Sequence, residues 1–235
     1  MSEGPPLGHP RLHLRGTDST NEQARTLALA GAPHGTLVTA AEQTAGRGRQ
    51  GRRWSAPTGS ALLMSLILRE PPPLLPLIAA VAVCDVAGDD ARVKWPNDIV
   101  FARGGQLAKL AGILIEGRPQ EGWAVLGIGV NVAVRVEELP AELRDTAASM
   151  GLSSKEIEPL LGRLLPALQR RLGEPSAAIL DAWRARDALR GREISWTGGC
   201  GRADGVDGDG RLVVALAGGG HTTLDAGEVH LKVGG

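Results

Sequence analysis

Apolar segments of strand length flank a stretch rich in glycine and arginine in the first third of the chain. Thr36–Glu42 and Ala61–Arg69 are short and mainly apolar, which predicts two buried strands. Arg11–Arg15 alternates polar and apolar residues and predicts an earlier strand. Ala24–Ala30 and Leu74–Ala87 have the length and composition of helices, and the second is apolar enough to be buried. The pattern therefore predicts strands and helices in one folded unit.

The middle of the chain continues this mixture. Strands are predicted at Arg92–Val100, Lys109–Glu116 and Trp123–Val132, and helices at Ser154–Leu172 and Pro175–Leu189. Pro96 cannot donate to a β-ladder, so the first of these strands is expected to bend or end there. Arg103–Gln106 contains the Gly-Gly pair of a hairpin turn.

From Gly191 the pattern changes to short β segments separated by glycine and aspartate. They are Glu193–Trp196, Arg202–Val206, Arg211–Ala217, His221–Leu224 and Glu228–Lys232. Such a series predicts a small barrel. We therefore expect two domains, at residues 1–188 and 189–235.

Length and composition fit this organisation and exclude several classes of protein. The chain has 235 residues, 43% hydrophobic and 22% charged, with no net charge. This is ordinary for a globular protein and provides no overall field for nucleic acid. Cys84 and Cys200 are far apart and the histidines are scattered, which argues against a disulfide framework or a zinc site. No signal sequence or membrane-length apolar run is evident, so a cytoplasmic protein without membrane contact is expected.

The stretch Glu42–Trp54 carries the strongest functional signal. Gly46, Gly48 and Gly51 alternate in it with four arginines, and glycine lets a backbone fold closely around a ligand. Arginine offers a planar set of donors suited to phosphate and carboxylate. Such a run also suits an RNA-binding tail or a solvated loop. Because it lies between two buried strands, we favour an active-site loop that closes over an anion.

Three polar features elsewhere are open to two interpretations. Thr17–Glu22 precedes a helix and either caps it or binds a polar ligand with its surplus side chains. Asn97 and Asp98 follow Pro96 and form either a plain turn or part of a site. Asn131 is flanked by valines and needs a partner if it is buried.

The absence or presence of known nucleotide-binding motifs limits the reactions that this chain can be expected to catalyse. The chain has no P-loop sequence, and the formal dinucleotide match at Gly46–Gly51 is filled with arginine and precedes a strand. The remaining features suit adenylation of a carboxylic acid. They are a cationic loop, Lys109 at the start of a buried strand, and Asp98 at a bend. That reaction brings two anions together and uses Mg²⁺ on the phosphates, with Asp98 as its candidate ligand.

Four segments in series, together with the C-terminal β region, resemble biotin protein ligases. They are Gly46–Trp54, Lys94–Asp98, Lys109–Glu116, Gly127–Asn131 and the end Gly227–Lys232. The resemblance implies an α+β fold with a mixed, mainly antiparallel sheet and flanking helices, as in class II synthetases, plus a small SH3-like barrel. It also implies that biotin and ATP give biotinyl-5′-AMP, which a lysine of a biotin carboxyl carrier protein then attacks.

The same resemblance implies roles for individual residues. Biotin would be held by Ser19, Thr20, Gln43, Gly46, Arg47 and Lys109, and ATP or the adenylate by Arg49, Arg52, Trp54, Asn97, Asp98 and Asn131. Lys109, Arg49 and Asp98 would be catalytic, with Asp98 on the Mg²⁺ side or orienting the acceptor lysine.

Two alternative functions stay open, and the chain differs from some family members at its N-terminus. A lipoate ligase or octanoyltransferase resembles the same catalytic fold, and a Gly/Arg RNA-binding module is the alternative from another class. Some family members carry an N-terminal DNA-binding domain, but the Ser-Thr-Asn motif here begins at Ser19. Nucleic acid is therefore not expected as a partner, whereas a homodimer is left open.

Overall fold

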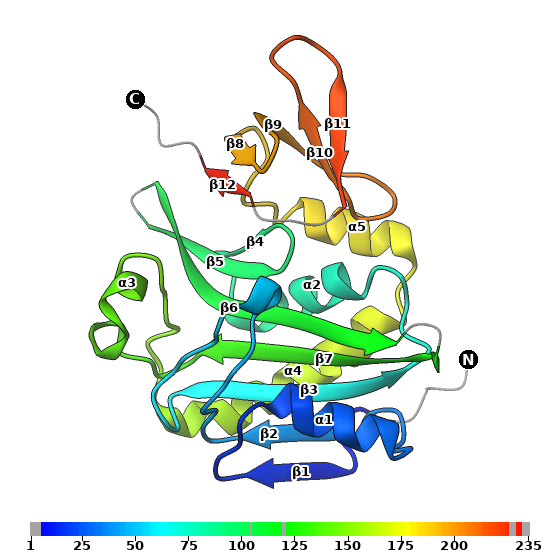
Figure 1. The fold of residues 1–235 in the computed structure, drawn as a ribbon, viewed down its shortest axis with the longest axis vertical. Helices are drawn as coiled ribbons and strands as arrows, with labels where there is room; N and C mark the ends of the chain where they lie inside the picture. Colours follow the sequence, from blue (N-terminus) through cyan, green and yellow to red (C-terminus); the bar gives the residue numbers. More distant parts are fainter. Residues whose placement is uncertain (1–5, 104, 119–120, 226–228, 232–235) are drawn as a thin grey trace.

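A seven-stranded sheet in the order β1-β2-β3-β7-β6-β5-β4 forms the main body of the computed structural model (Figure 1). The structure describes residues 6–103, 105–118, 121–225 and 229–231. β1 and β2 pair in parallel, and every other neighbouring pair in this sheet is antiparallel. The α+β fold with a mixed, mainly antiparallel sheet is therefore confirmed.

The elements have the following bounds. The strands of this sheet are β1 Arg11–Leu14, β2 Leu37–Ala40, β3 Ala61–Arg69, β4 Ala91–Lys94, β5 Asp98–Arg103, β6 Gln106–Arg118 and β7 Trp123–Asn131. The helices are α1 Thr20–Leu29, α2 Leu75–Ala87, α3 Ala141–Arg144, α4 Ile157–Leu172 and α5 Ser176–Arg184.

Helices cover the sheet unequally on its two faces. α1 packs on one face, whereas α2 and α4 pack together on the other, as Figure 1 shows. Nine of the thirteen residues of α2 are buried, because this helix lies between the sheet and the helices α4 and α5. On the face that carries α1, the Gly/Arg loop (Glu42–Trp54) and the start of this helix line a cavity together with the strands.

At three places the structure adds to the predicted elements or corrects them. The segment Arg92–Val100 is two paired strands, because β4 ends at Lys94 and Pro96 lies in the turn before β5. The first helix begins at Thr20 rather than Ala24. The segment after β7 contains α3, which is one turn long and has too little periodicity to be recognised from the sequence.

A second sheet of five strands follows α5, in the order β11-β10-β9-β8-β12. Its strands are β8 Glu193–Trp196, β9 Gly199–Val206, β10 Leu212–Ala215, β11 His221–Leu224 and β12 His230–Leu231. The indole of Trp95 donates a hydrogen bond to the carbonyl of Gly210, at 3.1 Å, and so connects the two sheets. Glu228 and Lys232 of the last expected strand, and Gly104 of the expected hairpin turn, lie outside the described residues. The exact domain boundary stays a prediction.

Within the described ranges, no helix combines the length and the apolar character that crossing a bilayer requires.

Substitution of Gly127 by alanine should lower the free energy of unfolding by about 1–3 kcal/mol. Gly127 lies in the middle of β7, where a Cβ would overlap the side-chain oxygen of Asn21. The matched control is Gly162→Ala, since Gly162 is exposed on α4 and a Cβ there meets nothing. In that variant the free energy of unfolding should instead rise by about 0.5–1 kcal/mol. Urea unfolding measures both, and equal effects in the two variants would contradict the packing described for Gly127.

Candidate active site

A cavity of about 450 Å³ lies on the face of the sheet that carries α1. It is bounded by the start of α1, the Gly/Arg loop, the strands β4 to β7 and the segment that contains α3. Val229 and His230 of the second sheet also line it, so both sheets contribute to one cavity. Of the predicted site residues, those on its lining are Ser19, Thr20, Gln43, Arg47, Arg49, Arg52, Trp54, Asn97, Asp98, Lys109 and Asn131.

Two glycines on neighbouring strands create space at the middle of this cavity. Gly112 of β6 is paired with Gly129 of β7, and the indole of Trp54 lies directly over both. A Cβ at Gly129 would come within 2.6 Å of Trp54 Cε2, and one at Gly112 within 3.0 Å of its Cζ3. The indole nitrogen of Trp54 is buried without a hydrogen-bond partner. These glycines are therefore required by the close approach of an aromatic ring.

The end of the cavity beside α1 is polar and internally hydrogen-bonded. The backbone N–H and the hydroxyl of Thr20 both donate to Gln43 Oε1, at 2.7 and 3.0 Å. Ser65 Oγ lies 2.8 Å from the Thr20 hydroxyl and donates to Asn21 Oδ1 at 2.6 Å. Ser19 is at the N-cap position, but its side chain makes no capping bond. Plain capping therefore does not account for Ser19, Thr20 and Asn21, which line the cavity.

The Gly/Arg loop folds back on itself as a narrow, closed arch. Trp54 N–H donates to the Gly46 carbonyl at 2.9 Å, and Gly48 N–H donates to the Arg52 carbonyl at 2.7 Å. A Cβ at Gly46 would lie 2.5 Å from the Trp54 carbonyl oxygen, so only glycine fits at this crossing. Gly46 itself is buried and does not line the cavity described above. Gly46 therefore determines the shape of the loop without contacting the cavity.

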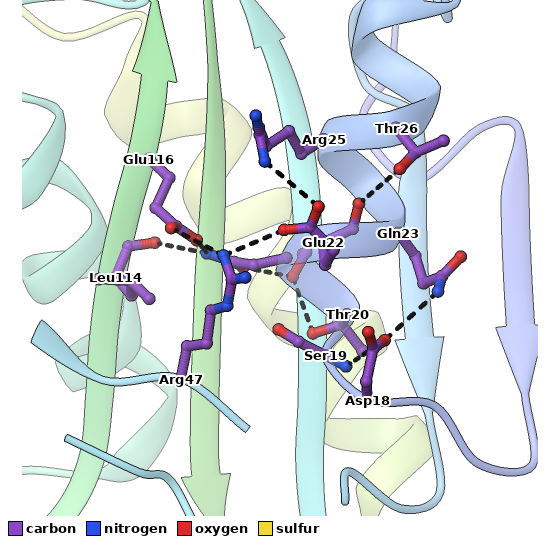
Figure 2. Close-up of polar contacts among 12 residues, drawn as sticks. Asp18, Ser19, Thr20, Glu22, Gln23, Arg25, Thr26, Arg47, Leu114 and Glu116 are labelled. Carbon is purple, nitrogen blue, oxygen red and sulfur yellow. Dashed lines mark hydrogen bonds and ion pairs between the residues drawn. The ribbon is translucent and has the colours of Figure 1, made fainter. Parts of the chain in front are cut away.

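The arginine side chains of this loop have different partners. Arg49 reaches into the cavity, where its Nη1 donates to Asn97 Oδ1 at 3.4 Å. Partial burial lowers the pKa of Arg49, an effect that the nearby Asp98 opposes. Arg53 donates to the Thr44 carbonyl at 2.7 Å, within the base of the loop. Arg47 pairs with carboxylates on the α1 side (Figure 2). Arg49 is thus placed to meet an anion in the cavity, which Arg52 also lines.

An ion pair between Lys109 and Asp98 stands at the other end of the cavity. Lys109 Nζ lies 2.7 Å from Asp98 Oδ1 and 5.7 Å from the centre of the Trp54 ring. Strict alternation along β6 would turn Lys109 away from the face that Gly112 occupies. A register shift against β5 at Ile99–Val100, which leaves Leu110 as the extra residue, turns it towards the cavity instead.

The two predicted asparagines are held by backbone groups. Asn97 Nδ2 donates to the Ile113 carbonyl at 2.7 Å, and Asn131 Nδ2 donates to the Ala148 carbonyl at 2.8 Å. Asn131 Oδ1 is buried without a partner. Asn131 therefore fixes the segment after β7 with one atom and has an acceptor left for a ligand.

Three residues that build the site were not among the predicted site residues. Ser65 and Lys94 had no predicted role, and Asn21 was considered only as part of the polar run Thr17–Glu22; Lys94 and Asn21 line the cavity. Ser65 had a recognisable signal, since it is the one polar residue inside the apolar run Ala61–Leu68. Burial lowers the pKa of Lys94, with Asp98 opposing this effect and Lys109 adding to it. Its position on β4 opposite Asp98 makes it a further cation at this end.

The cavity thus has a hydrogen-bonded polar end beside α1 and a charged end at Lys109 and Asp98. Residues 14–132 match the model of the Biotin/lipoate A/B protein ligase family. The chain is 33% identical over 239 residues to the biotin--[acetyl-CoA-carboxylase] ligase of Mycobacterium tuberculosis, covering 92% of this chain and 87% of that protein. It is 43% identical over 162 residues to the bifunctional ligase/repressor BirA of Bacillus spizizenii, covering 64% and 49% of the two.

One solved structure, biotin protein ligase from Aquifex aeolicus in complex with biotin and ATP, superposes with a TM-score of 0.78. It is 26% identical, and the match covers 95% of this chain and 99% of that one. The chain spans about half the length of the Bacillus relatives that it matches, 49% and 45%. The chain belongs to the biotin/lipoate A/B protein ligase family.

The lowered pKa of Lys94 predicts a pH-dependent effect of Lys94→Met on stability. In the folded protein Lys94 loses its proton at a lower pH than in the unfolded chain, where the ordinary value is 10.5. The unfolded state binds more protons between these two values, so the unmodified protein gains stability as pH rises through this window. Lys94→Met should therefore be the more stable protein at neutral pH, by a margin that shrinks as pH rises towards 10.5. Urea unfolding of both proteins across this range measures the margin, and a margin independent of pH would refute the buried-charge explanation.

Proposed function

We propose that this protein is an ATP-dependent biotin protein ligase. It activates biotin as biotinyl-5′-AMP with release of pyrophosphate and then transfers the biotinyl group to a lysine of a biotin carboxyl carrier protein. The observation that carries the proposal is a single cavity with a hydrogen-bonded polar end beside α1 and a cationic end at Lys109. The relatives named as biotin ligases, which match most of the chain, support biotin rather than lipoate as the acid.

The length of the cavity suits the first step. Gly127 lies beside Asn21 at the polar end, and Asn131 lies at the far end of the same strand. Four residues of strand span roughly 13 Å, at about 3.3 Å per residue. The polar end would hold the neutral ring of biotin through Ser19, Thr20 and Gln43, with its acyl chain running along the strands. The carboxylate would then lie near Lys109.

At the cationic end, Lys109 and Arg49 offset the charge of two anions that must meet. The carboxylate oxygen attacks the α-phosphorus of ATP, and the bond to the pyrophosphate oxygen breaks. Asp98 holds the Lys109 ammonium at this point through their 2.7 Å contact. Such preorganised charge stabilises a transition state without reorganisation at the moment of reaction.

In the second step the amine of the acceptor lysine attacks the acyl carbon, and AMP leaves. Arg49, Arg52 and Trp54 would hold the adenylate until the acceptor arrives, because the loop excludes water from a reactive intermediate. Asp98 would orient the incoming amine or act on the Mg²⁺ side. Asn131 Oδ1 supplies an unpaired acceptor for the nucleotide.

Magnesium bound with ATP fits the donor set at this end. Within the described residues no three His, Cys, Asp or Glu side chains gather as a metal site. Mg²⁺ on nucleotides needs only one or two protein oxygens, and Asp98 with Asn97 would supply them, the metal neutralising phosphate charge. The five-stranded second sheet would be an SH3-like barrel that covers the nucleotide, since Val229 and His230 line the cavity. The carrier as partner, a homodimer and the cytoplasmic location stay predictions.

Biotin-dependent exchange of pyrophosphate with ATP tests the function directly. Purified protein should catalyse exchange only when biotin is added, because exchange requires reversible adenylate formation. Lipoate, added in place of biotin, is the control acid in this assay. Exchange with lipoate but not with biotin would overturn the assignment.

Lys109→Ala should lower the rate of exchange by roughly 10²–10³-fold, as for loss of a donor that stabilises developing charge. The fold should persist, because the Lys109 side chain is 39% exposed. Lys155→Ala is the control, since Lys155 is exposed in the short turn Ser154–Glu156 before α4 and does not line the cavity. Near-normal exchange by Lys109→Ala would remove Lys109 from the mechanism.

A further inference from the structure

Arg47, the first arginine of the Gly/Arg loop, turns away from the cationic end of the cavity. Its Nη1 donates to Glu116 Oε1 at 3.3 Å and lies 3.0 Å from Glu22 Oε2 as an ion pair. Glu22 also pairs with Arg25, at 3.2 Å. Figure 2 shows the Arg47 guanidinium between the two carboxylates, which come from α1 and β6. We call Arg25, Glu22, Arg47 and Glu116 the Arg47 cluster.

Glu116 connects this cluster to the polar end of the cavity. Its second oxygen, Oε2, accepts a hydrogen bond from Asn21 Nδ2 at 2.8 Å. Asn21 is 4% exposed, and its carbonyl oxygen accepts from the buried hydroxyl of Ser65. Gly127 leaves the space into which Asn21 fits. One carboxylate of β6 therefore contacts both the base of the loop and the network that contains Thr20 and Gln43.

We propose that Glu116 is a positioning residue which, together with Glu22, anchors Arg47 and so fixes the base of the Gly/Arg loop. The inference rests on the proposed function, and it assigns Arg47 a structural role in place of contact with biotin through its side chain. A loop that contains Gly46, Gly48 and Gly51 has high conformational entropy when it is free. Anchoring its base leaves only the tip to be ordered by the ligand, which lowers the entropic cost of closure.

The size of the expected effect follows from exposure. The side chains of Arg47, Glu116 and Glu22 are 44%, 32% and 29% exposed, so solvent weakens each ion pair. Pairs of this kind contribute modestly, and loss of one should change the opening equilibrium of the loop roughly two- to fivefold. The hydrogen bond from Asn21 is independent of that pair and is kept by a glutamine at position 116.

Hydrogen exchange of residues 46–54 in the ligand-free protein tests the anchor without relying on activity. Arg47→Met and Glu116→Gln should each raise exchange in this segment roughly two- to fivefold. In the double variant, the rise in exchange should be only slightly larger than the larger of the two single-variant rises, because both changes remove the same contact. Arg25→Met is the matched control: it removes an ion pair to the same Glu22 but leaves the loop contacts, so exchange there should not change. Unchanged exchange in Arg47→Met, or an equal rise in Arg25→Met, would overturn the proposal.

A single-turnover experiment with biotin and ATP separates this proposal from the function itself. In Arg47→Met and Glu116→Gln, preformed adenylate should escape roughly two- to fivefold faster, while the rate of its formation changes less. A merely structural defect would lower formation and retention together, and that result would count against the anchor. If the unmodified protein forms no adenylate, the proposed function fails, and hydrogen exchange alone decides on the anchor.

Discussion

The register of the central strands is the constraint on which the site depends. Pairing places Gly129, Gly112, Asp98 and Lys94 in one row across β7, β6, β5 and β4. The two glycines leave the space that the Trp54 indole occupies, and the row then continues into charged side chains. A shift of one residue in any of these pairings would turn the charges to the other face of the sheet.

The cavity brings together parts of the chain that serve different purposes. Its polar end is built from buried hydroxyl and amide groups that fix one another, which gives a rigid and uncharged surface. Its cationic end is partly exposed and is built around the pair of Lys109 and Asp98. The arginines divide similarly, because Arg47 and Arg53 hold the base of the loop while Arg49 reaches inward. A substrate with a neutral head and an anionic tail matches this order.

Much of the fold could be predicted because local patterns determine it, and most of the site residues that the family resemblance implied line the cavity. The apolar runs marked β3, β6 and β7, and Pro96 marked the break before β5. What could not be predicted depends on distant pairing. The register shift that turns Lys109 towards Asp98 leaves no trace in the spacing of polar residues. Likewise Asn21 looked like a capping residue, whereas its partners Ser65 and Glu116 are on strands far along the chain.

In the proposed mechanism both ends of this cavity hold a single bound acyl-adenylate. The decisive measurement is a structure of the protein with a non-hydrolysable analogue of biotinyl-5′-AMP. We expect the biotin ring beside Thr20 and Gln43, the phosphate within hydrogen-bond reach of Lys109, and the adenine under the Gly/Arg loop. An analogue bound in the reverse orientation, or outside the cavity, would refute this mechanism.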